Sequence, residues 1–475
     1  MGDKNVDVVA ILNRLEVDGV ELREQVLAGA LLQQMDETMQ EMLSRGLVFE
    51  LPVPREALTA VCENIPNLDN YINRAVALGL LEVSPDESLR VPRILPLTLS
   101  THVETLYQQA AEVLYRLWWK QGETRTEEEV LEIHRLALLG KKGEIASKVG
   151  AILASNLKAK SRFREALHLC KETLNFVENY HILHQLARSE EQLGEIEQAK
   201  QHYQKALEIC PTADEKTKAV IIHNLAGIYA NTGEIEDAIT LYHESLQLQK
   251  SIGNLQATGA TFRELGRIYY AKIGKIEEAI FLYQETLKLE ESIGNISGKA
   301  STLHQLASIY VDKGKIDYAI ALYEKSLKIF ENIGDIQGIA ATLHDLAFIY
   351  SNQGKVEDAI LLYEKSLKIF ESIEDIKGQA VSLYCLASIH ADAGEIDYAI
   401  ALYEKSLKIF ESIRDAPQQA FTLVMLGYLL AYKKGDFVTA LDYLHQSLGI
   451  FQHIQSPDAE TVRGFINDVQ QMANG

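Results

Sequence analysis

The chain has 475 residues, of which 47% are hydrophobic and 24% are charged, and its formal net charge is −21. This composition is typical of a protein that buries a large core, and it excludes a disordered or fibrous chain. The negative charge opposes unassisted binding to nucleic acid or to an anionic membrane. No stretch approaches the roughly 20 apolar residues of a membrane-spanning helix, and the N-terminus lacks the basic start of a signal peptide. We therefore expect a cytoplasmic protein that does not cross a membrane.

Residues 1–100 are predicted to form a small domain of their own. Residues 1–45, 57–61 and 68–78 have helical patterns, and residues 79–83 and 89–91 read as two short strands around the polar turn Ser84-Pro85-Asp86-Glu87. Helices followed by such a hairpin have the order of a winged helix. The expected second helix, residues 68–78, has no basic run, so the electrostatic attraction that supplies most DNA affinity is missing.

Residues 101–144 are predicted to be a helical buttress between this domain and the remainder of the chain. A first helix covers residues 103–119. A second helix opens at Thr126 with Glu129 three residues later, which is the pattern of a capping box.

Residues 145–455 are built from an internal repeat. The segment IDYAIALYEKSLKIFE occurs at residues 316–331 and again, letter for letter, at residues 396–411, with a near copy at 356–371. One alanine of this block marks the register, and its copies are separated by 39, 41, 40, 40, 40 and 41 residues. These alanines are Ala199, Ala238, Ala279, Ala319, Ala359, Ala399 and Ala440. With a more diverged copy ahead of them, the sequence predicts eight repeats.

Each repeat is predicted to be a helical hairpin. Within one copy, apolar residues recur at helical spacing up to Tyr350, Gly354 interrupts them, and the spacing resumes at Val356. Between copies, Gly253, Gly294 and Gly334 stand where a helix must end, and each is followed by Asn or Asp, which can cap the next helix. The fold class is therefore all-α.

This order of leucine, small residue, tyrosine, glycine, alanine and a second aromatic resembles the tetratricopeptide repeat (TPR) family, in an extended form with about 40 residues per repeat. The resemblance implies a right-handed superhelix, an α-solenoid, whose concave groove is lined by the first helix of each hairpin and binds peptides or partner proteins. The N-terminal region resembles the winged-helix segment of signal transduction ATPases with numerous domains (STAND). The resemblance is carried by the segments GLVFELPVP, RAVALGLLEV and LRVPRILP. Many of those ATPases end in TPR arrays.

Residues 456–475 are predicted to form a helix that closes the array. It begins at Ser456-Pro457-Asp458, an N-cap followed by proline, and it carries Val462, Phe465, Ile466 and Val469 on one face.

Polar residues recur on the predicted first helices at positions that face the groove in the family. The first row consists of His223, Asn224, Arg263, His304, Gln305, His344, Asp345 and Tyr384, and a later row consists of Asn231, Asp312, Asn352 and Asp392. The resemblance implies contact with a bound peptide for these residues, and packing between helices is the alternative. A shared metal ion is excluded because neighbouring repeats rise by roughly 10 Å, whereas metal–ligand bonds are near 2 Å.

Arg263 and Arg267 lie one turn apart on the same predicted first helix. In a chain of net charge −21, two arginines on a groove wall favour an acidic or C-terminal carboxylate segment as the ligand. The alternative is that they neutralise Glu264 and other nearby carboxylates.

Nothing in the sequence predicts catalysis or a cofactor. There is no P-loop motif, and Cys62, Cys170, Cys210 and Cys385 form no C-x-x-C pair, so neither a zinc site nor a disulfide framework is indicated. We therefore expect a non-enzymatic scaffold that binds a protein or peptide. Two alternatives stay open: a sensor arm that works with a separate STAND-type ATPase or effector, and a winged-helix transcription regulator with a TPR sensor.

Overall fold

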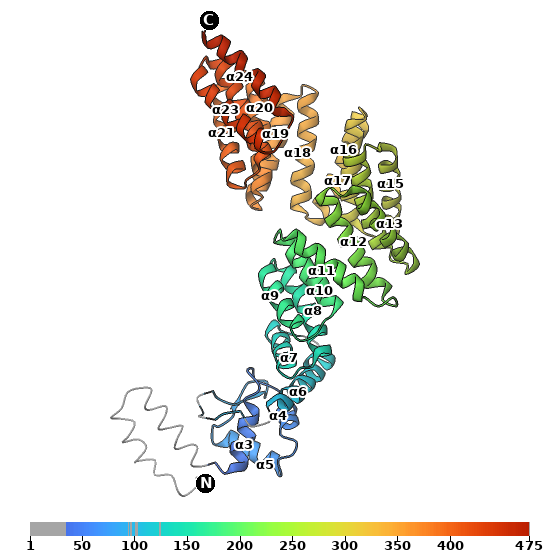
Figure 1. Cartoon of the computed structure of the whole chain (residues 1–475), viewed down its shortest axis with the longest axis vertical. Helices are drawn as coiled ribbons and strands as arrows, with labels where there is room; N and C mark the ends of the chain where they lie inside the picture. Colours follow the sequence, from blue (N-terminus) through green and yellow to red (C-terminus); the bar gives the residue numbers. More distant parts are fainter. Residues whose placement is uncertain (1–34, 94, 96, 100–102, 123–124, 475) are drawn as a thin grey trace, which may run out of the picture. The chain divides into compact units, whose positions relative to one another are not determined.

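The computed structural model describes residues 35–93, 95, 97–99, 103–122 and 125–474 (Figure 1). The helix expected at the start of the chain falls largely within residues 1–34, which lie outside the described residues. The chain divides into two units, residues 1–248 and residues 249–475. Each unit is described by itself.

The first unit begins with three short helices and a hairpin. The helices are α3 (Glu37–Gly46), α4 (Arg55–Val61) and α5 (Leu68–Ala77), and the strands are β1 (Glu82–Val83) and β2 (Leu89–Arg90). The strands pair antiparallel, with Glu82 opposite Arg90 and Val83 opposite Leu89. The predicted order of helices followed by a two-stranded hairpin is confirmed.

The buttress consists of α6 (Val103–Leu114), the π-helical turn η1 (Tyr115–Gln121) and α7 (Glu127–Leu139). The predicted capping box is present, because the Thr126 side chain accepts from the Glu129 backbone and the Glu129 side chain accepts from the Thr126 backbone. Trp119 is buried, and the Arg125 guanidinium lies 4.8 Å from its ring centroid. This tryptophan therefore packs within the fold.

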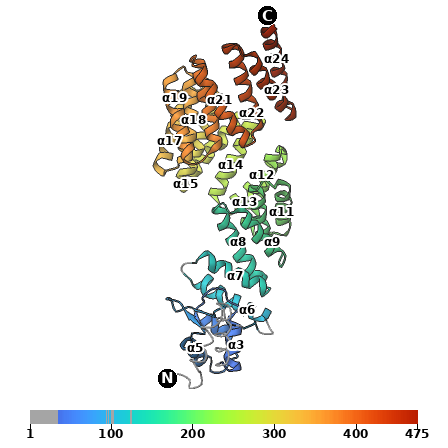
Figure 2. The ribbon, with the colours of Figure 1, turned by 90° about the vertical axis from the view of Figure 1, so that its left-hand side faces the viewer.

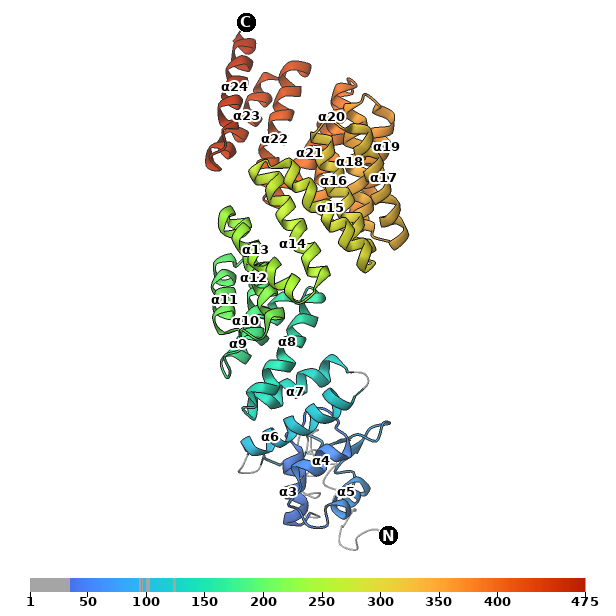
Figure 3. The same cartoon turned by 90° about the vertical axis from the view of Figure 1, so that its right-hand side faces the viewer.

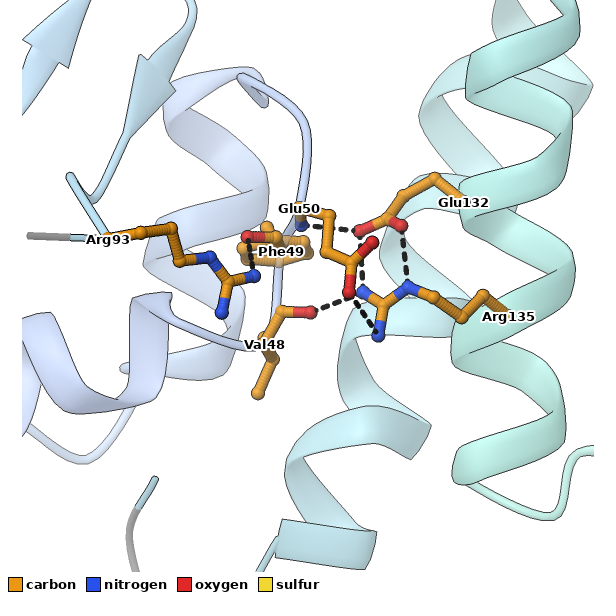
Figure 4. Close-up of polar contacts among 6 residues, drawn as sticks. All are labelled: Val48, Phe49, Glu50, Arg93, Glu132 and Arg135. Atoms are coloured by element: carbon orange, nitrogen blue, oxygen red, sulfur yellow. Dashed lines mark hydrogen bonds and ion pairs between the residues drawn. The ribbon is translucent and has the colours of Figure 1, made fainter. Parts of the chain in front are cut away.

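An ion pair on α7, in which Glu132 is buried and Arg135 is partly exposed, holds the segment that follows α3 (Figure 4). Arg135 donates two hydrogen bonds of 2.8 Å to Glu132, and it also donates to the backbone carbonyl of Val48 at 2.6 Å. Glu132 accepts from the backbone N–H of Glu50 at 2.7 Å. Because both charged groups are paired and hydrogen-bonded, the strand-like segment after α3 is fixed against α7.

Sixteen helices of the described residues pair into eight hairpins. They are α8 (Gly143–Ala159) with α9 (Phe163–Leu174), α10 (Tyr180–Gln192) with α11 (Ile196–Ile209), α12 (Glu215–Thr232) with α13 (Ile235–Ser251), α14 (Leu255–Ile268) with α15 (Ile276–Ile293), α16 (Ile296–Asp312) with α17 (Ile316–Ile333), α18 (Ile336–Asn352) with α19 (Val356–Ser372), α20 (Ile376–Asp392) with α21 (Ile396–Ser412), and α22 (Ala416–Leu429) with α23 (Phe437–His453). In the second unit the first helices α16, α18, α20 and α22 each pack on their own second helix and on the second helix before it, and α14 packs on α15 (Figure 2).

The core of six of the eight hairpins is built from the recurring alanine and tyrosine of the second helix; Cys170 takes the place of the tyrosine in α9 and Leu444 takes it in α23. The seven alanines that mark the register are fully buried, and the tyrosines four residues after them are 0–2% exposed. These tyrosines are Tyr203, Tyr242, Tyr283, Tyr323, Tyr363 and Tyr403. A buried serine of the second helix also donates to a backbone carbonyl of the first, as Ser366 does to Ala340 at 2.8 Å. The alanine allows close approach, and the tyrosine fills the space beside it.

The predicted turns between hairpins are present. Gly253, Gly294 and Gly334 have φ angles of 68°, 69° and 71°, the left-handed region that a residue without a Cβ atom adopts most readily. The following Asn254, Asn295 and Asp335 cap the next helix by accepting hydrogen bonds from Ala257, Gly298 and Gly338.

One position near the end of each second helix seals the junction to the next hairpin. Phe330 and Phe370 are buried there, and their rings lie against Gly338 and Gly378; an added Cβ atom at either glycine would be 2.5 Å from the ring. The same position is occupied by Glu290 one repeat before Phe330. The second unit therefore seals its junctions with different side chains.

Two repeats contain 41 residues between their register alanines, and both end their first helix in a π-helical turn. η2 (Tyr269–Ile273) follows α14, and η3 (Leu430–Lys434) follows α22. The extra residue is thus absorbed as a π turn, and the second helix after it keeps its register.

Helix α24 (Asp458–Asn474) packs against α23 at the end of the array (Figure 3). Val462, Ile466 and Val469 are buried in this contact. This helix lies where the sequence predicts a closing helix, and it covers apolar surface of the last hairpin.

Candidate functional site

The predicted groove residues lie on the first helices of five successive hairpins, α12, α14, α16, α18 and α20. Those on α12 belong to the first unit and the others to the second. His223, Asn224, Arg263, Arg267, His304, His344, Asp345 and Tyr384 are half-buried, whereas Asn231, Gln305, Asp312, Asn352 and Asp392 are exposed.

The ring at the first groove position packs on the buried tyrosine of its own hairpin. The ring centroids are 5.0–5.2 Å apart and the rings meet edge to face. The pairs are His223–Tyr242, His304–Tyr323, His344–Tyr363 and Tyr384–Tyr403. One face of each groove ring is therefore used inside the hairpin, and the polar atoms remain for contacts between hairpins.

His304 and Asp345 link two hairpins of the second unit. His304 Nε2 lies 3.1 Å from Asp345 Oδ2, and His304 Nδ1 lies 3.2 Å from the Thr342 hydroxyl. Asp345 also accepts from the Tyr323 hydroxyl at 3.3 Å. Two residues predicted to contact a ligand thus bind each other across α16 and α18, as His184 and Asn224 do at 2.9 Å in the first unit.

Both groove arginines have carboxylate partners within the array. Arg263 forms an ion pair with Glu290, which is buried on α15. Arg267 forms two hydrogen bonds, of 2.9 and 3.0 Å, with Glu264 one turn before it. These are the neutralising contacts that the sequence allowed as the alternative. Arg267 is 43% exposed, so its ion pair is open to solvent.

The later polar row lies at the C-terminal ends of the first helices. Asp312 accepts a hydrogen bond from the Tyr270 hydroxyl of the preceding hairpin, and this contact contributes to a raised pKa of Tyr270, of about 12, whose largest cause is burial. Asn231, Asn352 and Asp392 are exposed at equivalent places.

A pocket of about 270 Å³ opens between α18 and α20. Its lining includes two predicted groove residues, His344 and Asp345, and the remaining residues are Ala341, Phe370, Asp375, Lys377, Gly378 and Val381. Burial lowers the pKa of His344, so this ring is neutral at pH 7 and can either donate or accept. The pocket therefore combines an apolar floor with a polar rim, which is the usual design of a small binding site.

Reasoning from the sequence missed most of this lining. Phe370 and Gly378 contribute because the glycine leaves the ring and the first turn of α20 accessible. Their recurrence as Phe330 and Gly338, one repeat earlier, was a signal that could have identified them. Lys377 carried no such signal; it pairs with Asp415 at 3.0 Å.

Models of the tetratricopeptide repeat match residues 180–213, 217–292, 298–372 and 378–453, which is more than half of the chain. The protein is a member of the tetratricopeptide repeat family. No curated protein matched the sequence of this TPR protein.

Among solved structures, the TPR protein is similar to a STAND protein with a tetratricopeptide repeat sensor from Pyrococcus horikoshii. The two share 18% sequence identity with a TM-score of 0.63, and the similarity covers 97% of this chain and 69% of that chain. It also matches the aspartyl phosphate phosphatase F from Bacillus subtilis (13% identity, TM-score 0.45, 69% of this chain and 93% of that chain). A Rap protein complexed with competence and sporulation factor matches at 15% identity and a TM-score of 0.46, over 78% and 94% of the two chains. The first of these similarities supports the fold.

The TPR protein shows no cluster of three or more potential metal ligands within the part of the chain that the structure describes. Among the described helices, none is long and apolar enough to cross a membrane.

Proposed function

We propose that this TPR protein is a non-enzymatic scaffold that binds a peptide or partner protein in the groove of its array. The observation that supports this most is the pocket between α18 and α20, because two residues chosen from the sequence, His344 and Asp345, line it. An apolar side chain of a bound peptide fits the floor formed by Phe370 and Val381. Its backbone can bond to the polar rim.

We further propose an acidic or C-terminal carboxylate segment as the ligand class. Arg267 is the arginine that supports this proposal, because its partner Glu264 is 36% exposed and a ligand carboxylate can replace it at small cost. Arg263 is held by a carboxylate that is 2% exposed, and it supports the fold of the junction instead.

The groove is tested by selecting peptides from a displayed library against the purified full chain and measuring their affinity by fluorescence anisotropy. Ala341→Arg places a long charged side chain in the pocket, and we expect it to weaken a selected peptide at least tenfold. Leu361→Arg is the matched control, because Leu361 is exposed on the outer helix α19. Equal loss of affinity in both variants, or no loss in either, would contradict the proposal.

A sensor arm of a STAND-type system is the second candidate. It is supported by the similarity to the Pyrococcus horikoshii protein, which extends over 97% of this chain and so includes the N-terminal domain. In this case a separate ATPase or effector would bind the protein. Adding the purified protein to an ATPase encoded beside it should change the rate of ATP hydrolysis, whereas the protein alone should show no turnover.

A further inference from the structure

A hollow of about 640 Å³ lies in the first unit between α7, the end of α9 and the segment that follows α3. Its lining comprises Glu50, Leu51, Glu128, Leu131, Glu132, His134, Arg135, Leu138, Leu139, Leu169, Glu172, Asn175 and Phe176. A second hollow of about 190 Å³ shares Leu138, Asn175 and Phe176 with it. The two therefore form one elongated groove, here called the α7–α9 groove.

Large apolar side chains are exposed in this groove. Leu131 is 40% exposed, Leu139 is 44% exposed and Phe176 is 56% exposed. Glu128, Leu131, Arg135 and Leu138 follow one another at steps of three or four residues, so they lie on one face of α7. The distance from Glu128 to Leu139 corresponds to roughly 16 Å of helix, or three turns. This apolar face has the length of a short helical segment.

The floor of the groove is held by hydrogen bonds and an ion pair. It is formed by the Glu132–Arg135 pair, whose atoms bind the backbone of Val48 and Glu50 as Figure 4 shows. His134 is buried below, where burial lowers its pKa to about 4, so it carries no charge at neutral pH. A partner therefore binds to a preformed surface, so that little free energy is spent on ordering the side chains of the groove.

The rim of the groove is acidic. The lining of the two hollows contains Arg135, which is paired with Glu132, and Lys141, which is paired with Glu104. Three exposed carboxylates, Glu50, Glu128 and Glu172, belong to the lining. Glu50 lies 3.6 Å from Arg135, and Glu172 lies 3.4 Å from a ring nitrogen of His168. This arrangement excludes a second copy of a chain with net charge −21 as the preferred occupant, because like charges would meet. It complements a basic partner.

We propose that the α7–α9 groove is a second docking site, separate from the groove of the array, for a basic amphipathic helix of a partner protein. Leucine-sized side chains of this helix lie on Leu131, Leu139 and Phe176. Its lysine or arginine side chains reach Glu50, Glu128 and Glu172. The apolar contacts supply most of the affinity, and the carboxylates select the sign of the partner's charge.

The probe is a fluorescein-labelled 18-residue peptide with leucine at every third or fourth position and lysine at the others, titrated with the full chain. Two control peptides have the same composition in scrambled order, or glutamate in place of lysine. We expect micromolar binding of the amphipathic basic peptide, at least tenfold weaker binding of the scrambled peptide, and no binding of the acidic one.

Two double variants locate the site. Leu131→Ser with Phe176→Ser should weaken binding at least tenfold, whereas Ile152→Ser with Phe281→Ser, which removes side chains that are 45% and 60% exposed elsewhere, should leave it unchanged. Glu128→Gln with Glu172→Gln should weaken binding about threefold and reduce its dependence on salt, and Glu357→Gln with Glu371→Gln is the control.

Three results would overturn the proposal. They are unchanged affinity in the Leu131/Phe176 variant, equal affinity for the acidic peptide, and a concentration-dependent dimer that this variant abolishes in analytical ultracentrifugation. The last result would identify a second copy of the chain as the occupant. Thermal unfolding of each variant shows whether a lost affinity reflects a lost fold; because all eight substituted positions are exposed, we expect unchanged midpoints.

Discussion

The second unit seals its hairpin junctions in two ways. At the later junctions the rings of Phe330, Phe370 and Phe410 are buried. The rings of Phe330 and Phe370 also lie against a glycine of the next helix. At the earlier junctions Gln249 and Glu290 occupy the same place, although both are only 2% exposed. The same backbone arrangement thus accepts an apolar or a polar seal.

Both polar seals are bound by side chains of α14, which is the next first helix for Gln249 and the first helix of the same hairpin for Glu290. The Thr261 hydroxyl donates to Gln249 at 2.9 Å, and Arg263 pairs with Glu290. A buried ion pair stabilises less than an apolar residue of the same volume, because desolvating the charges offsets their attraction. The aromatic junctions therefore contribute more to stability, and the stability of the Glu290 junction depends on its ion pair with Arg263.

The largest expected effect comes from removing an aromatic seal. Phe370→Ala should lower the free energy of unfolding by about 4 kcal/mol, because it leaves a cavity between α19 and α20. The measurement is urea denaturation followed by circular dichroism. Leu361→Ala, on the exposed side of the same helix, is the control and should change the value by less than about 0.5 kcal/mol.

Removing the cation of the polar seal should have the next largest effect. Arg263→Met leaves Glu290 buried without its counter-charge and should cost about 2–3 kcal/mol. Arg267→Met breaks a partly exposed ion pair on the same helix and should cost less than about 1 kcal/mol. Equal costs in the two variants would show that the Glu290 junction does not depend on pairing.

Converting the polar seal into an aromatic one should raise stability. Glu290→Phe should increase the free energy of unfolding by about 1 kcal/mol, since Gly298 occupies the place that Gly338 has beside Phe330. Without Glu290, the Arg263 side chain, which is 29% exposed, can be solvated. Glu291→Phe, at the exposed neighbouring position, should give no increase. A lower denaturation midpoint for Glu290→Phe would contradict the equivalence of the two seals.

The smallest effect is a pH dependence of the polar seal. Burial raises the pKa of Glu290 above the ordinary value of 4.5, outweighing the lowering by Thr302 and Arg263. The native state therefore holds the proton more tightly than the unfolded state. The associated stability is present at pH 4.5 and is lost as the pH rises through the raised pKa. Relative to Glu290→Gln, the wild type should lose stability between pH 4.5 and pH 7, measured by thermal unfolding; an opposite slope would show that Arg263 dominates.

Much of the array was predictable from the sequence because its signals are local. The alanine register, the glycine turns and the Asn or Asp caps each depend on neighbouring residues, and the structure confirms the hairpins, the left-handed glycines and the caps. The capping box at Thr126 and the closing helix after Ser456 were predictable for the same reason.

The contacts of the candidate site were less predictable because they join distant residues. Arg263 and Glu290 are 27 residues apart, and Arg135 bonds to Val48, which is 87 residues away. Aligning the repeats does place Glu290 in an aromatic column, and that signal was available. Which arginine would reach it depends on side-chain packing across α14 and α15, which the periodicity does not specify.

The π turns η2 and η3 have a consequence for the length of the repeat. The residue that each one adds is accommodated where a first helix ends, and the second helix that follows keeps its buried alanine, with Tyr283 four residues later in α15 and Leu444 in α23. Spacing along the array is therefore maintained by these contacts and not by a constant number of residues. One-residue insertions after Tyr310 or Tyr350 should be tolerated in the same way, so the ends of the first helices are the places where repeats of this kind can change length without losing their stacking.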